Sequence, residues 1–141
     1  MLNKTQVGDM EHALSNGSRF YSESNNKDWN ELVENGFATK HPGWEEGMAY
    51  YRVSQEGKKT LELSDYQLGK LKHCFGLDYS NKPYRNYYHC NKLNEEWEDM
   101  ISKGYATKRM VSENEIHYFG TWKALRTAYR RNISYKYFEA I

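Results

Sequence analysis

One block of sequence decides the fold because it occurs twice: DWNELVENGFATK at residues 28–40 and EWEDMISKGYATK at residues 96–108. Both copies have Trp at the second position, Gly at the ninth and Ala-Thr-Lys at the end. Chance does not place these residues in the same order twice, so the chain contains an internal repeat.

The repeat extends to both sides of this block. Upstream, QVGDMEHAL matches QLGKLKHCF, and RFY falls opposite RNY, with the second copy a few residues longer. Downstream, YRVS faces YFGT. We therefore expect a first repeat over residues 1–63, a second over residues 64–128, and a basic, aromatic C-terminal extension over residues 129–141.

Both repeats are predicted to begin with helices. Apolar residues at helical spacing in residues 7–14 and 68–75 predict an amphipathic opening helix in each copy. A polar, irregular stretch follows, and then a short helix over residues 28–35 and 95–103. A Gly directly after each short helix supplies the left-handed residue that commonly ends a helix.

The second half of each repeat is predicted to be a hairpin and a closing helix. Two short strands lie on either side of a turn in residues 37–53 and again in residues 105–119. Ser54 and Thr121 can each cap the helix that follows. The fold class is therefore α+β, with two tandem winged-helix-like repeats (helix, short helix, two-stranded wing, helix) packed together. A domain of about 60 residues is only marginally stable, so we expect the two repeats to pack together around one shared core. Two independently folded units are the alternative.

Composition sets the broad class of the protein. The 141 residues have a net charge of +1 and 16% aromatic side chains, which disordered chains lack. No apolar run is long enough for a membrane span, and the first residues lack the apolar core of a signal peptide. Two cysteines are too few for a disulfide scaffold. These features predict a folded cytoplasmic protein with no membrane partner.

Charge is divided unevenly along the chain. Residues 1–66 contain seven Lys or Arg and eleven Asp or Glu, whereas residues 67–141 contain thirteen and eight. The short helix of each copy is acidic, and DNA phosphates would repel it from a groove. We expect these helices to contact a partner protein instead, through Asp28, Glu31, Glu34, Glu95, Glu96, Glu98 and Asp99. An acidic half and a basic half also suit a head-to-tail homodimer.

Positive charge gathers toward the end of the second repeat. A patch for nucleic acid or an acidic partner is predicted from Lys108, Arg109, Lys123, Arg126, Arg130 and Arg131. Trp122, Leu125 and Tyr129 share the opposite, apolar face of the closing helix. An ordinary amphipathic helix with a solvated basic face is the alternative interpretation.

Two resemblances follow from these residues. Residues 32–39 with 51–57 resemble the recognition-helix, wing and closing-helix portion of bacterial winged-helix regulators, with Ser54 where Thr is usual. More specifically, HCFGLD at residues 73–78 with KPYRNYY at residues 82–88 is similar to small accessory proteins of phages and prophages. That resemblance covers mainly residues 66–108. It implies a regulator, or an inhibitor of host defence of the anti-CRISPR kind acting in the host cytoplasm.

A third candidate surface lies within the phage-like motif. Arg85, Asn86, Tyr87 and Tyr88 could form a recognition surface, since exposed Tyr and Asn are favoured contact residues. The matched arginines at positions 19 and 85 could instead pin the irregular segment.

Metal and catalytic motifs are weak. His73-Cys74 and His89-Cys90 repeat sixteen residues apart and suggest zinc, but adjacent residues on a helix point about 100° apart. We expect a buried Cys and a hydrogen-bonded His, with no metal and no cofactor. No phosphate loop or nucleophile elbow is present, so no catalytic residue is predicted.

The sequence therefore predicts a non-catalytic, phage-type accessory protein that binds and inhibits a host protein or nucleoprotein complex. The alternative is a winged-helix DNA-binding regulator that uses the second repeat. A metal-dependent nuclease is a weaker third hypothesis.

Overall fold

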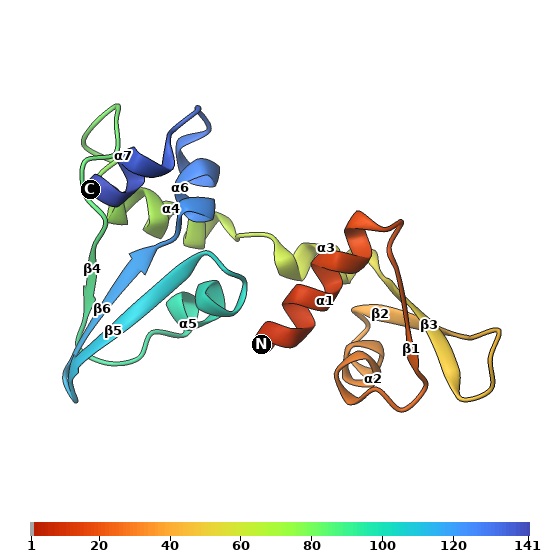
Figure 1. Cartoon of the computed structure of the whole chain (residues 1–141). Helices are drawn as coiled ribbons and strands as arrows, with labels where there is room; N and C mark the ends of the chain where they lie inside the picture. The colour runs from red at the N-terminus through yellow and green to blue at the C-terminus, as the bar shows by residue number, and fades with distance from the viewer. Residues whose placement is uncertain (1) are drawn as a thin grey trace. The chain divides into compact units, whose positions relative to one another are not determined.

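The computed structural model describes residues 2–141 and shows an α+β protein made of two compact units, Leu2–Glu62 and Leu63–Ile141 (Figure 1). The first unit has the order helix, strand, helix, strand, strand, helix. Its elements are α1 (Lys4–Ser15), β1 (Arg19–Glu23), α2 (Lys27–Glu34), β2 (Ala38–Pro42), β3 (Met48–Val53) and α3 (Gln55–Leu61).

The second unit repeats this order and adds a last helix. Its elements are α4 (Asp65–Cys74), β4 (Tyr88–Cys90), α5 (Glu95–Ser102), β5 (Ala106–Ser112), β6 (Glu115–Gly120), α6 (Trp122–Tyr129) and α7 (Tyr135–Ala140). The predicted opening helices, short helices, hairpin strands and closing helices are thus confirmed, with ends that differ by a few residues. Within residues 2–141, no helix has the length and apolar character to cross a membrane.

Each unit contains a three-stranded antiparallel sheet and not the expected two-stranded wing. The strand orders are β1-β3-β2 and β4-β6-β5. The strands β1 and β4 come from the stretch predicted to be irregular, and both pair with the central strand of their sheet. These segments are only five and three residues long, and strand preference depends strongly on context, so pairing with the partner strand determines their conformation.

The sheet register corrects the alignment of the two copies. Phe20 pairs with Tyr51 in the first sheet, and Tyr88 pairs with Tyr118 in the second. Since Tyr51 and Tyr118 are equivalent, Phe20 corresponds to Tyr88, and the predicted match of RFY with RNY is off by two residues. A shift of two leaves every side chain on the same face of the sheet, because side chains alternate with a period of two.

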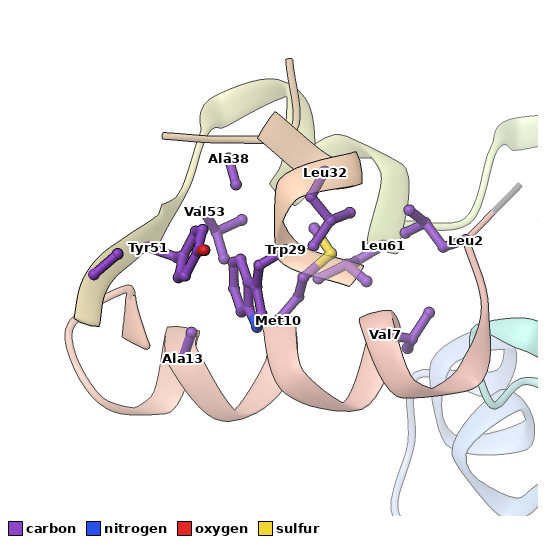
Figure 2. Packing of buried hydrophobic residues seen from close by; sticks show 11 residues of the cluster. Leu2, Val7, Met10, Ala13, Trp29, Leu32, Ala38, Tyr51, Val53 and Leu61 are labelled. Carbon is purple, nitrogen blue, oxygen red and sulfur yellow. The ribbon is translucent and has the colours of Figure 1, made fainter. Parts of the chain in front are cut away.

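Matching aromatic stacks form the centre of both cores. Trp29 is fully buried between Phe20 and Tyr51, with ring centroids 5.0 and 5.4 Å away. Trp97 lies in the same way between Tyr88 and Tyr118, at 5.1 and 5.3 Å. Figure 2 shows Trp29 against Met10 of α1 and Tyr51 of β3 in the first core.

The buried apolar residues form two clusters, one inside each unit. In the second unit the C-terminal segment enlarges the core, because Ile133, Phe138 and Ile141 pack against it. The Tyr137 hydroxyl also donates a 2.7 Å hydrogen bond to the Pro83 carbonyl. Residues 129–141 therefore belong to the packing of the second unit.

Candidate nucleic-acid interface

An open hollow of about 720 Å³ lies at the C-terminal end of α6 in the second unit. Its lining comprises Trp122, Arg126, Arg130, Arg131, Asn132, Ile133 and Ser134. Three arginines thus line one space together with Trp122. This arrangement gathers half of the predicted basic patch into a single site.

Packing on the indole holds Arg126 in place. Its guanidinium carbon lies 4.2 Å from the centroid of the Trp122 ring, a cation–π contact. The Trp122 Nε1 in turn donates a hydrogen bond to the Ile133 carbonyl at 3.4 Å, which connects the helix to the loop that closes the hollow. The arginine is therefore oriented before any ligand arrives.

The loop that carries the other two arginines begins with a left-handed residue. Arg130 ends α6 with φ of 59°, one of two positive-φ residues other than glycine among residues 2–141. A left-handed backbone conformation costs about 1 kcal/mol for a residue such as Arg, whose side chain does not form the local hydrogen bonds that favour Asn and Asp in this region. Arg131 follows, and its guanidinium carbon lies 6.0 Å from the centroid of the Tyr129 ring.

No carboxylate neutralises these three arginines within the described chain. The ion pairs of residues 2–141 involve other groups, and Arg126, Arg130 and Arg131 take part in none of them. A helix C-terminus favours cations, which accounts for a basic residue in the last turn. Three unpaired guanidinium groups around one hollow leave a strongly positive surface.

The remaining members of the predicted patch lie elsewhere. Lys108 forms a 2.7 Å ion pair with Glu98, and the Lys123 Nζ donates to the Lys103 carbonyl at 3.2 Å. Arg109 lies exposed on β5, in register with His117. The structure thus does not bring Lys108, Arg109 and Lys123 to the hollow.

Lys108 has a structural counterpart in the first unit. Lys40 donates to the Asn30 side chain at 3.0 Å, as Lys108 does to Glu98. The buried tyrosine of each core bonds to that same acceptor: the Tyr51 hydroxyl donates to Asn30, and the Tyr118 hydroxyl donates to Glu98. The repeated Ala-Thr-Lys therefore connects the hairpin to the short helix.

The acidic helices divide into bonded and free carboxylates. Asp99 accepts from Gln67 and pairs with Lys103, each at 2.8 Å, and Asp28 accepts from Asn3 at 3.0 Å. Glu98 is held by Lys108, as described above. On α2 and α5, the exposed carboxylates without a bonded partner among residues 2–141 are those of Glu31, Glu34, Glu95 and Glu96.

Three of the four residues predicted as a recognition surface, at positions 85–88, make contacts within the second unit. Arg85 donates twice to the His73 carbonyl, at 2.8 and 3.3 Å, and so pins the segment to the end of α4. The Asn86 side chain bonds to both backbone groups of Gly120. Tyr88 packs in the core, which leaves Tyr87 as the exposed residue of the set.

The structure does not gather His73, Cys74, His89 and Cys90 into one site. The Nδ1 of His73 lies 2.6 Å from Asp78, and this bond lowers the pKa of the Asp78 carboxyl. Cys74 is fully buried, and burial raises the pKa of its thiol to about 11. Burial also raises the pKa of Cys90.

Sequence reasoning missed two features of the surface. Trp44, in the turn between β2 and β3, is 76% exposed and stacks on Tyr21. His89 lies beside His117 and Glu115, residues that the sequence did not single out. A Trp beside Pro42 and Gly43 was a visible sign of an exposed turn aromatic, whereas nothing local joins His89 to His117.

Comparison of the chain with protein-family models, curated proteins and solved structures found no match.

Proposed function

We propose that this protein acts by binding, and that its second unit binds the phosphate backbone of nucleic acid at the arginine hollow. The observation that carries the proposal is that Arg126, Arg130 and Arg131 line one open hollow and take part in no ion pair among residues 2–141. A guanidinium group can donate two parallel hydrogen bonds to a phosphate, whereas a lysine ammonium acts as a point charge. Arginine is therefore favoured over lysine at phosphate-binding sites.

Aromatic side chains beside the hollow support a single-stranded ligand. The Trp122 ring lines the hollow, and Tyr135 packs edge-on against it at 5.3 Å while remaining half exposed. Bases of single strands stack on such rings with little sequence preference, while cations nearby track the backbone. We therefore expect single strands to bind more tightly than duplexes.

A tandem winged-helix-like arrangement is part of this proposal. In each unit a short helix precedes a hairpin and a closing helix, as in the families that the sequence resembles. The exposed glutamates of α2 and α5 argue against insertion of these helices into a groove, since phosphates flank it on both sides. Contact at the end of α6 avoids this repulsion.

A fluorescence-anisotropy titration of labelled single-stranded and duplex DNA and RNA across a salt series tests the proposal. Counterion release gives a slope of about −0.7 per phosphate contact for single strands, so three contacts contribute about −2 to the salt slope. We expect the triple Gln variant of Arg126, Arg130 and Arg131 to lose about tenfold or more in affinity and to lose that part of the slope.

A charge-matched control separates the hollow from net charge. Lys72, Lys92 and Arg109 are exposed in the same unit and do not line the hollow, and their triple Gln variant removes the same charge. Equal losses in both variants, or no binding by the wild-type chain at low salt, would overturn the proposal.

A second candidate function is inhibition of a host protein or nucleoprotein complex that handles nucleic acid. Four exposed carboxylates without bonded partners, on α2 and α5, favour it, because such groups can occupy a site built for phosphates. Capture of a host nucleic-acid-binding complex that is lost after reversal of Glu31, Glu34, Glu95 and Glu96 to Lys would support this function. Capture that persists in the reversed variant would contradict it.

A further inference from the structure

The outer face of the second sheet brings together two histidines from different strands. His89 of β4 and His117 of β6 are direct partners in the antiparallel register. Their neighbours Tyr88, Ile116 and Tyr118 face the core, so alternation along the strands places both imidazoles on the opposite face. Glu115, two residues before His117, shares that face.

The three side chains converge on a small volume. The Glu115 Oε1 lies 3.0 Å from the His117 Nε2 and 3.8 Å from the His89 Nε2. All three potential ligand atoms lie within 4.8 Å of one another. Ligands of a tetrahedral zinc ion, at about 2.0–2.1 Å from the metal, are about 3.4 Å apart. Small side-chain rotations would therefore complete three bonds to one ion.

We propose that His89, Glu115 and His117 form a binding site for a single divalent transition-metal ion, with Zn²⁺ as the ion that suits the ligand set. Two imidazoles and a carboxylate are a ligand set that zinc accepts, and the single negative charge partly balances the ion. The fourth position faces solvent, since His89 and Glu115 have side chains about two-fifths exposed.

The charge environment sets the expected strength. Arg109 of β5 is the register partner of His117, so a fixed cation lies on the same face of the sheet, next to the site. Its repulsion and the exposure of the ligands limit the affinity, which we expect to be on the order of micromolar, well below that of closed structural zinc sites. The Cys90 side chain takes no part, because it faces the core side of β4.

The first unit offers an internal comparison. At the equivalent register positions it has Tyr21 and Tyr50, whose rings are 4.8 Å apart. The Tyr21 hydroxyl donates to Glu45 at 3.2 Å. The same place in the fold thus holds a packed aromatic pair in one unit and a histidine pair in the other, so the metal site is specific to the second unit.

The consequence of binding is a link between β4 and β6. The strand β4 has three residues and pairs with β6 alone. An ion held by both strands would stabilise this edge, by an amount that rises with the logarithm of the free ion concentration once that concentration exceeds the Kd.

The test uses the full chain, stripped of metal with a chelator, in a Zn²⁺ competition titration against a chromophoric indicator. We expect one Zn²⁺ per chain, visible absorption bands on addition of Co²⁺, and a melting temperature that rises with Zn²⁺. The double variant His89→Tyr with His117→Tyr copies the first unit's pair and should abolish all three effects. Glu115→Gln should weaken binding about tenfold or more.

Two controls make the outcome decisive. His41→Ala removes an exposed histidine from the first unit and should leave binding unchanged. Circular dichroism verifies that each variant is folded, and Glu115→Gln still tests the site if the double variant is not. Absence of stoichiometric binding by the wild-type chain, or binding that survives in a folded double variant or is unchanged in Glu115→Gln, would overturn the proposal.

Discussion

Replacement of Asn86 by Ala is expected to destabilise the second unit strongly. The Asn86 side chain acts as one more residue of a strand: its Oδ1 accepts from the Gly120 N–H at 2.7 Å, and its Nδ2 donates to the Gly120 carbonyl at 2.9 Å. In the first unit the backbone carbonyl of Ser18 accepts from the equivalent Val53 N–H at 3.2 Å. A side-chain amide thus replaces a backbone contact.

The magnitude follows from the groups left unpaired. Gly120 is buried, so the substitution leaves its N–H and its C=O without the partners that Asn86 supplies, and the Cys74 thiol loses a 3.3 Å bond to the same Oδ1. Each unsatisfied buried backbone group costs about 1–3 kcal/mol. With partial rehydration, we expect a loss of about 3 kcal/mol in the free energy of unfolding.

Hydrogen exchange measured by mass spectrometry over a urea series reports each unit separately. Peptides from residues 63–141 should reach their midpoint at about 2 M lower urea in the Asn86→Ala variant, given an m-value of about 1–2 kcal/mol/M, while peptides from residues 2–62 should not change. Asn91→Ala, at an exposed Asn in the same unit, serves as the control. If the loss of stability in Asn86→Ala is no larger than that in the control, the Asn86 side chain does not replace a strand residue.

Three further predictions follow from packing and burial. Gly57→Ala should destabilise the first unit by about 2 kcal/mol or more, because the new Cβ would collide with the Phe37 carbonyl. Gly8→Ala, on the open surface of a helix, should instead stabilise the unit by about 0.5–1 kcal/mol. Thermal melts of both variants check these two expectations. In the native chain, iodoacetamide should label Cys90 faster than Cys74, as read by mass spectrometry; equal rates would contradict the burial of Cys74. Because the pKa of Cys74 is raised from 9.0 to about 11, the unfolded state loses this proton first as pH rises, so stability should fall between pH 9 and pH 11 by about 2 kcal/mol. A Cys74→Ala variant should show a smaller loss over that range in urea titrations.

The predicted helices were correct because their signals are local. Asn3 with Gln6 and Ser64 with Gln67 form capping boxes within single turns. The glycines that follow the short helices adopt φ of 80° and 83°, as their position in the repeat suggested. Such interactions span three or four residues, so they are visible in the sequence.

The strands β1 and β4 were missed for the opposite reason. Their conformation depends on pairing with β3 and β6, which lie tens of residues away. The two-residue error in aligning the copies has the same origin, since register is set by the partner strand and by which face is buried. The bonds of Arg85 and Asn86 were not visible in the sequence, because their partners, His73 and Gly120, belong to other elements.

Taken by itself, the sequence determined the repeat and the helices, because repetition, periodicity and capping act over short distances. It also marked Arg126, Arg130 and Arg131 as basic residues near aromatic rings. Only the tertiary structure grouped these arginines around Trp122 and placed His89 opposite His117. Both arrangements depend on a chain reversal or a strand register, and neither is encoded in the spacing of neighbouring residues.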